Sequence, residues 1–269
     1  MKLLKYILVI FLFLIFSSTF MGGNVDTIRV HNTEISPANK AFSPGESLKY
    51  QLYYGPVNAG EAKMKVSKTT YNNQTVHHLV TEAYSTGLAS RIYRLHNTYE
   101  SFINPSNGLP LKAIRDVNEG SHSRYNEVIY DHEKNVVHSK QSGTHEVPEY
   151  IMDKVSAIYK LRNYLNGREL SEGDVLFFET YLGDEIYPLI IHYKGTDEVR
   201  TRSGYYNALK FSPVAETGRM FKSEDAITIW LSNDKNLIPL KVRLNMLIGS
   251  VNADLIEYSG LQYKLTNSR

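Results

Sequence analysis

Residues 147–167 read VPEYIMDKVSAIYKLRNYLNG and carry the clearest helical period in the chain. Apolar side chains three and four positions apart fall on one face of a helix: Ile151, Val155, Ile158, Leu161 and Leu165. Pro148 suits a first helical turn, and Asn166-Gly167 suits a C-terminal cap. The pattern predicts one principal helix over about 148–166.

Arg162 lies inside this apolar face and admits two interpretations. A guanidinium in such a place needs acceptors, because burying an unpaired charge is costly. One interpretation is a structural ion pair with an Asp or Glu of a sheet. The other is that Arg162 anchors the acidic head of an apolar ligand held between helix and sheet, with Ile158 and Val155 as further ligand-binding residues. The sequence leaves both open.

On both sides of the helix the hydrophobic period changes to two, which is typical of β-strands. Strand candidates are the segments 48–54, 62–66, 125–130, 175–182, 186–194, 207–214, 226–232, 238–246 and 250–259. A shorter helical turn is predicted at 87–95. Short strands joined by tight turns favour an antiparallel sheet that curls or closes. We therefore expect a mainly β fold, a large curved antiparallel sheet or half-open β-barrel, with one principal helix between two similar halves.

The similarity of the halves rests on two segments, YESFINPSNGLPLKAIRDV at 99–117 and ITIWLSNDKNLIPLKVRLNM at 227–246. Each predicts a strand, a loop of turn formers, a Pro-Leu-Lys and a second strand. The prolines stand where a strand begins and no ladder N–H is needed. Trp230, the single Trp, precedes the second loop where the first has Phe102 or Ile103, so we interpret it as a packing residue. An ancient duplication and similar hairpin chemistry both explain the match.

The chain begins with MKLLKYILVIFLFLIFSSTFMGG, the layout of a secretory signal peptide. We assign 1–23 to this signal; an uncleaved anchor stays open, because no clean small-x-small triplet precedes Asn24. Residues 24–41 are rich in Asn, Thr, Ser and Pro and predict a flexible tether. The remainder, 42–269, is expected to be a single β-rich domain. Cysteine is absent, and export without disulfides fits a bacterial periplasm or cell envelope.

Composition and motifs argue against several kinds of chemistry. The net charge of +2 comes from mixed signs, so no footprint for nucleic acid is visible. There is no G-x-S-x-G motif, and the nine histidines show no familiar metal-ligand spacing. The pairs Asp184-Glu185 and Glu224-Asp225 stand in turn-like contexts, where solvated charges are more usual than the acids of a glycosidase. We expect no enzymatic activity, no cofactor and no metal site.

Four segments in the same order resemble the bacterial exported domain-of-unknown-function family 3108 over 42–258. They are SPGESLKYQLYYGPVNAGEAKMKV (43–66), DKVSAIYKLRNYL (153–165), RSGYYNALKFSP (202–213) and ITIWLSNDKNLIPLKVRLNMLIGSVNADL (227–255). This resemblance implies no activity. The hairpin form is also similar to hairpins of the periplasmic lipoprotein carriers LolA and LolB, half-open β-barrels whose helices cover an apolar cavity. That similarity implies a non-enzymatic carrier or binding protein for lipidic ligands.

Three functions remain as hypotheses. The first is a periplasmic carrier or binding protein for a lipidic or other apolar ligand, with membrane contact only through an uncleaved N-terminal segment. The second is a cell-envelope structural or glycan-interacting protein, favoured by a cavity too small for an acyl chain. Its candidate surface residues are Tyr53, Tyr54, Tyr93, Tyr99, Tyr205 and Tyr206. The third is an envelope glycan hydrolase, which needs two carboxylates converging in one cleft.

Overall fold

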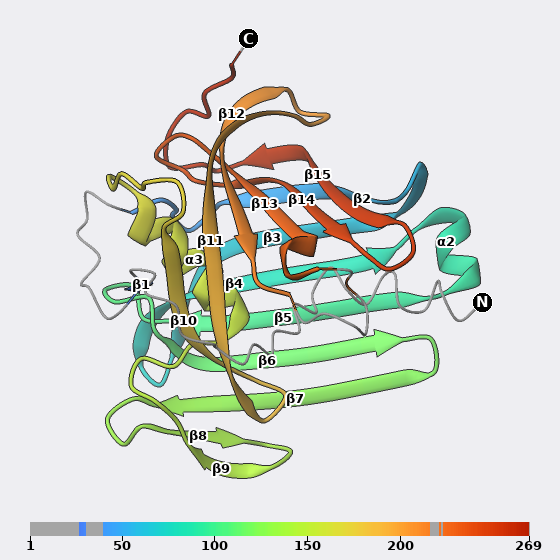
Figure 1. Ribbon diagram of the computed structural model, residues 1–269. Helices are drawn as coiled ribbons and strands as arrows, with labels where there is room; N and C mark the ends of the chain where they lie inside the picture. Colours follow the sequence, from blue (N-terminus) through green and yellow to red (C-terminus); the bar gives the residue numbers. More distant parts are fainter. Residues whose placement is uncertain (1–26, 31–39, 216–220, 222, 269) are drawn as a thin grey trace.

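The computed structural model describes residues 27–30, 40–215, 221 and 223–268. The predicted signal peptide at 1–23 lies outside these residues, as does most of the predicted tether. The described strands form one sheet of 15 strands in the order β1-β10-β11-β12-β13-β14-β15-β2-β3-β4-β5-β6-β7-β8-β9. Figure 1 shows this sheet bending round α3 (Lys154–Leu165). The predicted mainly β fold with a curved sheet is confirmed.

The strands before α3 in the chain are β1 (Thr27–Arg29), β2 (Ser47–Tyr54), β3 (Val57–Tyr71), β4 (Gln74–Ser85), β5 (Leu95–Ile103), β6 (Pro110–Glu119), β7 (His122–Asp131), β8 (Val136–Ser139) and β9 (Gly143–Glu146). Those after it are β10 (Val175–Leu182), β11 (Glu185–Arg200), β12 (Tyr205–Pro213), β13 (Ile227–Ser232), β14 (Pro239–Asn245) and β15 (Ser250–Ser259). Besides α3, the described part contains α2 (Gly87–Ile92) and the short 3-10 helix η2 (Glu224–Ala226). No helix of the described part is long and apolar enough to cross a membrane.

Two meanders of six strands, β2–β7 and β10–β15, make up most of the sheet. Neighbouring strands within each meander are antiparallel, as expected from the short turns between them. The two meanders join where β15 pairs with β2, from Val251 opposite Tyr54 to Ser259 opposite Ser47. The sheet is therefore continuous across the two halves, and β1 and β9 are its edges.

The repeated hairpin occupies the same place in both meanders, as their fourth and fifth strands. Pro110 begins β6 and Pro239 begins β14. Each hairpin also has a register shift just before its loop, between Phe102 and Ile103 and between Trp230 and Leu231. Phe102 lies opposite Lys112 as Trp230 lies opposite Lys241, so Phe102 is the counterpart of Trp230. Trp230 is buried and its ring N–H donates to Asp197, as a packing residue with a satisfied polar edge does.

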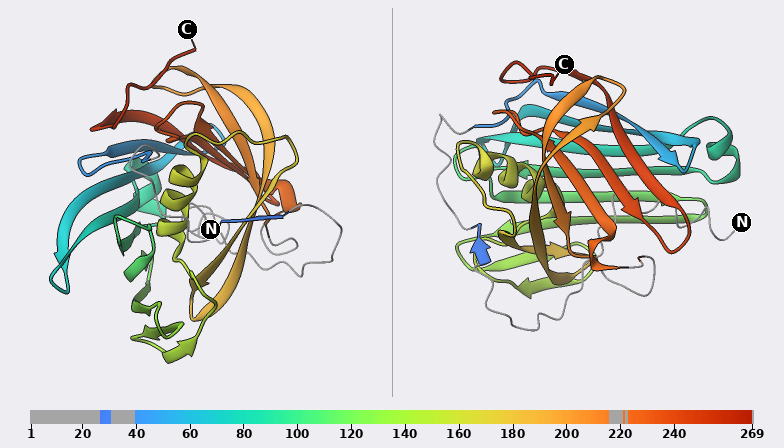
Figure 2. Two further views of the ribbon diagram at one scale, coloured as in Figure 1. Left: turned by 90° about the vertical axis from the view of Figure 1, so that its left-hand side faces the viewer. Right: turned by 45° about the horizontal axis from the view of Figure 1, so that its top comes forward.

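Helix α3 packs between the two meanders, and this position explains why most of its side chains, polar ones included, are buried. Val155 and Tyr159 belong to an apolar cluster that extends from β2–β6 into β11–β15, while Leu161 and Leu165 belong to a second cluster built mainly on β10–β14. Figure 2 shows the helix inside the bend of the sheet, with strands on both sides. A helix covered on two sides buries residues outside a single stripe. The hydroxyl of Tyr50 on β2 donates to the carbonyl of Pro239 at 2.8 Å and links the halves directly.

The predicted start of the helix at Pro148 is wrong by six residues. Asp153 is the N-cap: its carboxylate accepts from the backbone N–H of Val155 at 2.8 Å and of Ser156 at 3.0 Å. The preceding chain is extended, because Met152 donates to and accepts from the backbone of β10. The predicted C-terminal cap at Asn166-Gly167 is found, with Gly167 in the left-handed region.

Three further differences concern short elements. Within the predicted tether, Thr27–Arg29 pair in parallel with β10 and are therefore a strand. Strands β8 and β9 were not predicted, because four-residue strands carry too few alternations to show a period. The predicted helical turn at 87–95 ends at Ile92, since Leu95 already starts β5.

Candidate functional site

Arg162 lies at the centre of a closed hydrogen-bond network. Its Nη1 and Nη2 donate to the two carboxylate oxygens of Glu46, both at 2.7 Å. Its Nε and Nη2 donate to the carbonyl of Asn236 at 3.1 and 2.9 Å, and Nη2 also reaches the carbonyl of Ala41 at 3.3 Å. Neither side chain of the ion pair has exposed surface. Every nitrogen of the guanidinium therefore faces a protein acceptor.

The surroundings of the pair favour the charge on Arg162. Burial alone opposes the charge on Arg162, but the Glu46 carboxylate outweighs it and raises the pKa of Arg162. The rings of Phe42 and Tyr159 lie 5.4 and 5.0 Å from the guanidinium carbon and add cation–π contacts. This geometry is the structural ion pair of the first interpretation, although Glu46 directly precedes β2 and does not lie within it.

An apolar cavity of about 130 Å³ lies between α3 and both meanders. Val155, Ile158 and Leu161 line it from the helix. From the sheet it is lined by residues of β2–β5 and β11–β14: Tyr50, Met64, Thr81, Tyr99, Leu189, Ile191, Ile229, Leu231, Pro239, Val242 and Leu244. The structure thus places the predicted ligand residues Val155 and Ile158 at a cavity, whereas Arg162 is not among its lining residues.

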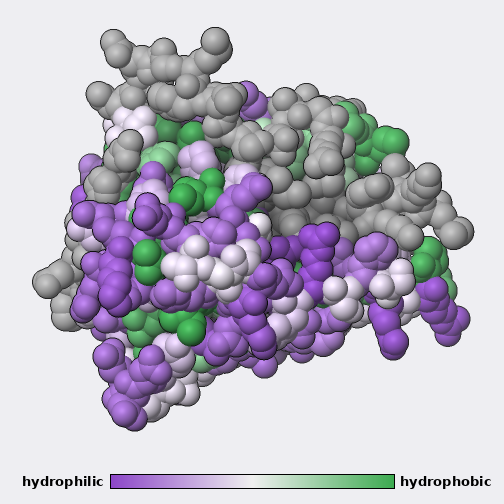
Figure 3. Space-filling model, turned by 90° about the horizontal axis from the view of Figure 1, so that it is seen from below, coloured by the Kyte–Doolittle hydropathy of each residue, from purple (hydrophilic) through white to green (hydrophobic). Residues whose placement is uncertain are grey.

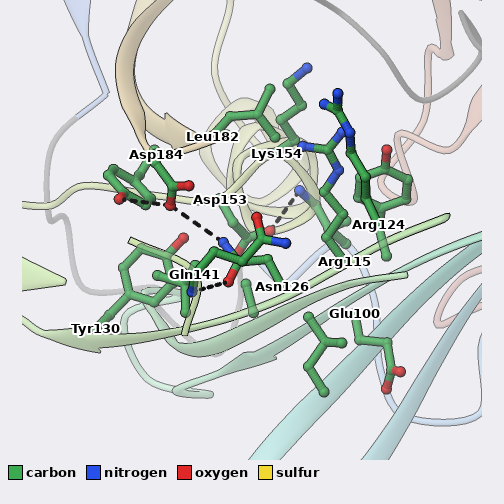
Figure 4. A pocket seen from close by; sticks show the side chains of 17 residues that line it. Glu100, Arg115, Arg124, Asn126, Tyr130, Gln141, Asp153, Lys154, Leu182 and Asp184 are labelled. Atoms are coloured by element: carbon green, nitrogen blue, oxygen red, sulfur yellow. Dashed lines mark hydrogen bonds between the residues drawn. The ribbon is translucent and has the colours of Figure 1, made fainter. Parts of the chain in front are cut away.

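A polar cavity of about 260 Å³ adjoins the N-terminal end of α3. Figure 4 shows the side chains that line it, which come from β5–β7, the β8–β9 turn, the start of α3, and the end of β10 with its turn to β11. Three of them are cationic: Arg115 on β6, Arg124 on β7 and Lys154 at the first position of α3. The two cavities share Tyr99, Lys154 and Val155 as lining residues, so they are neighbours across these three side chains.

One cross-strand row of the sheet explains how both cavities arise. Met64, Thr81, Tyr99, Arg115 and Asn126 lie opposite one another in succession on β3 to β7. Side chains at directly opposed positions project from the same face of a sheet. The row begins with the apolar side chain of Met64 at the first cavity and ends with Arg115 and Asn126 at the second. Polarity therefore changes along a single row, on the face that α3 covers.

The acidic residues of the polar cavity already have protein partners. Asp153 caps α3 with one oxygen and accepts from the Ser101 hydroxyl at 2.6 Å with the other. Burial raises the pKa of Asp153 against these hydrogen bonds. Asp184 accepts from Tyr181 at 3.3 Å and Asn126 at 3.4 Å. Glu100 lines the cavity, but its carboxylate bonds His78, and Figure 4 shows its side chain pointing away.

The cations of the polar cavity affect one another. Burial of its ammonium, and then the nearby guanidinium of Arg115, lower the pKa of Lys154 well below its ordinary value. Tyr99 lies opposite Arg115 on the next strand, and burial raises the pKa of its hydroxyl to about 12. The site therefore combines positive charge with a low local dielectric, in which electrostatic interactions are strong.

One hydroxyl that lines the apolar cavity, Thr81 Oγ1, is buried and makes no hydrogen bond within the described part of the chain. The phenol of Tyr99 interacts with the Arg115 side chain, which opposes the effect of burial on its pKa. Thr81 is 8 % exposed. Most buried polar atoms in proteins are hydrogen-bonded, and an unsatisfied one costs free energy.

The other sequence-based candidates do not assemble into a site. Tyr99 and Tyr206 are buried, so the six tyrosines do not form one glycan-stacking surface. Of the carboxylate pairs, Asp184 lines the polar cavity, whereas Asp225 accepts from the hydroxyl of Ser212 elsewhere on the sheet. Among the residues that the structure places, no group of three or more His, Asp or Glu side chains is arranged to hold a metal ion.

Arg115, Arg124 and Lys154 were not predicted as site residues. Alternation along the strands, with Arg115 and Val117 on one face of β6, was available as a signal, but the pairing of strands was needed to bring the three cations together. Seen from below, the molecule is mainly hydrophilic with separate hydrophobic patches (Figure 3).

A family model described as "Protein of unknown function (DUF3108)" matches residues 49–256. The chain belongs to this family. The match covers most of the sequence, including both repeated hairpins and α3, so the family resemblance seen in the sequence is confirmed. No activity is attached to the DUF3108 family by its description, and no curated protein matches the chain.

One solved structure supports the fold of this DUF3108 chain, and two others have a lower similarity. A β-barrel-like protein of the DUF1849 family from Brucella abortus is 8% identical, with a TM-score of 0.51, and the match covers 80% of this chain and 96% of that one. A hypothetical protein from Chlamydia trachomatis is 9% identical over 88% of this chain and 97% of that chain, with a TM-score of 0.38. A DUF1089 protein from Pseudomonas aeruginosa is 11% identical, with a TM-score of 0.33, and the match covers 83% of this chain and 95% of that one. The first similarity concerns the fold alone.

Proposed function

We propose that the protein is an exported, non-enzymatic binding or carrier protein for a small apolar or lipidic ligand held between α3 and the curved sheet. The observation that carries this proposal is the apolar cavity bounded by the helix and both meanders. A cavity of roughly 150 Å³ with an apolar lining stays dry and binds benzene, so one of about 130 Å³ is large enough for a ligand group of that size.

The volume limits the ligand. A complete lipid acyl chain is larger than a benzene-sized cavity, so the apolar cavity takes a short apolar group or the end of a longer chain. The rest of such a ligand lies beside Tyr99, Lys154 and Val155, which also line the polar cavity. We place the protein in the bacterial periplasm or cell envelope on the strength of its N-terminal sequence. A sheet that surrounds a helix and an apolar cavity also agrees with the resemblance to lipoprotein carriers.

The small volume favours one alternative, a structural or glycan-interacting protein of the cell envelope. In that case the cavity is a packing defect between two meanders and takes no ligand. The two functions differ in a simple measurement, because a packing defect gives no saturable binding of an apolar molecule.

Binding of octan-1-ol, measured by isothermal titration calorimetry, tests the proposal. We expect saturable binding with one site in the wild type, and a bound apolar species in native mass spectra after gentle purification. Ile158→Phe extends a half-buried side chain into the cavity, so it should abolish binding without lowering the melting temperature.

The matched control is Ile186→Phe, the same substitution at an exposed residue of β11 that lines neither cavity. It should leave binding of octan-1-ol unchanged. Bare polypeptide in the native spectra together with no calorimetric binding by the wild type contradicts the proposal and favours the structural alternative.

A further inference from the structure

We propose that the polar cavity binds the anionic head of an amphiphile whose apolar end occupies the apolar cavity. The ligand class is an apolar chain that ends in a carboxylate or phosphate. This inference rests on the proposed function, since it concerns the other end of the same ligand. It replaces Arg162 as the predicted head-group anchor with Arg115, Arg124 and Lys154.

The first step of the argument is continuity between the cavities. Tyr99, Lys154 and Val155 line both. A ligand that extends from the apolar cavity past these residues lies beside Arg115 and Asn126, which continue the cross-strand row beyond Tyr99. Only a molecule with an apolar and a polar end matches both linings at once.

The second step is the sign of the charge. Arg115, Arg124 and Lys154 contribute three cationic groups from three different elements. The carboxylates of Asp153 and Asp184 accept hydrogen bonds from side chains and backbone of the protein itself. Arginine binds carboxylate and phosphate through paired N–H donors, so an anion is the complementary partner.

The third step is independent of charge. The hydroxyl of Thr81 lines the apolar cavity next to Tyr99 in the cross-strand row, is more than nine-tenths buried and makes no hydrogen bond in the described part of the chain. Such groups are usually satisfied by a partner, and an oxygen of a bound head group is one that reaches them from the cavity. The apolar cavity alone offers no such partner.

The electrostatics of Lys154 agree with this assignment. Its burial and the neighbouring Arg115 guanidinium lower its pKa, while a bound anion has the opposite effect and stabilises the charged ammonium. Binding of an acid is therefore expected to be accompanied by uptake of protons, which calorimetry detects as a dependence of the binding enthalpy on the buffer.

The test compares octanoate, octyl phosphate and octan-1-ol by isothermal titration calorimetry at pH 7. Octanoate or octyl phosphate should bind the wild type at least about tenfold more tightly than octan-1-ol, and the tighter of the two identifies the head group. Lys154→Met and Arg115→Gln should remove this preference, and Arg115→Gln, which alters a residue outside the apolar cavity, should leave the affinity for octan-1-ol unchanged. Lys160→Met is the matched control on the same helix, because Lys160 lines neither cavity, and it should keep the preference.

The outcomes separate the two proposals. Equal affinity for the alcohol and both acids in the wild type overturns the head-group inference and leaves the proposed function standing. No binding of any of the three overturns both. If Lys154→Met does not fold, Arg124→Gln replaces it: Arg124 is exposed at the cavity mouth, and an unchanged acid preference in that variant counts against the inference.

Discussion

Arg162 is the residue at which helix, sheet and N-terminal segment meet. Its guanidinium binds Ala41 and Glu46, which precede β2, and Asn236, which lies far from them in the sequence. Burial of two charges is costly, and the attraction between them offsets that cost only when the geometry is good and the remaining hydrogen bonds are satisfied. Here the pair is bidentate and fully enclosed, so its value lies in fixing where α3 docks.

Removing one member of this pair should therefore be more harmful than removing both. We expect Arg162→Leu to lower the free energy of unfolding by about 3–5 kcal/mol, because it leaves Glu46 buried and unpaired. The double variant Arg162→Leu with Glu46→Leu should lose less than either single change. Urea unfolding of the four proteins measures the cycle.

An Arg162→Leu protein of unchanged stability that no longer binds octan-1-ol would reverse this assignment and support Arg162 as a ligand anchor. The position of Arg162 on the helical wheel predicted that it is buried. Its partner could not be predicted, because the pairing depends on how the segment before β2 crosses the end of α3. The same applies to Arg115 and Arg124, whose neighbours are set by strand register.

Among the helices and strands, α3 is the one whose first residue was hardest to predict. Pro148 looked like a helix start, but Asp153 and Ser156 form a capping box that begins the helix later. By contrast, the period and flanking turn residues predicted β10 as 175–182 and β15 as 250–259 at their observed bounds. Strands with strong alternation are visible in the sequence, whereas β8 acquires its structure by pairing with β7, and β9 by pairing with β8.

Lys160 on α3 should make the free energy of unfolding depend on pH. Its ammonium donates to the carbonyl of Asn107 at 2.7 Å, and burial lowers its pKa from 10.5 to about 8. Between these values the unfolded chain keeps a proton that the folded chain has lost, so the free energy of unfolding increases as the pH rises through 8. We expect an increase of the order of 1 kcal/mol from pH 7 to 9.

The measurement is denaturant unfolding at pH 7, 8 and 9 for the wild type and Lys160→Met. The difference between the two proteins isolates Lys160, because Lys154 and the tyrosines titrate in both. The variant should lack this part of the increase. Identical pH profiles for the two proteins would show that Lys160 keeps an ordinary pKa in the folded state.

At the scale of the whole molecule, the pairing of β15 with β2 makes the two meanders one structure. Ala253 is fully buried on β15 and lies opposite Leu52 on β2 and Val242 on β14. The curved antiparallel sheet and its two similar halves were predicted from alternation and from the repeated hairpins. The seam between the halves was not, because no local pattern indicates which strands at the two ends of the chain become neighbours.

Breaking the seam should unfold both halves together. Ala253→Pro places a proline in the middle of the sheet, where it disrupts the ladder, and we expect a loss of at least about 3 kcal/mol in a single transition. Thermal unfolding followed by circular dichroism measures this. Ser259→Pro, at the last residue of the same strand, is the control and should cost much less. Two separate transitions in the Ala253→Pro protein would instead show that each meander folds alone.

The same seam also sets the order of events when the chain is made. β2 is complete early in synthesis, but β15, its partner, emerges on the order of 200 residues later. During that interval one edge of β2 has no native neighbour, and an unpaired strand edge readily joins another chain. Contacts between such distant positions also slow folding. The last strand to appear therefore determines how long the nascent protein is exposed to aggregation.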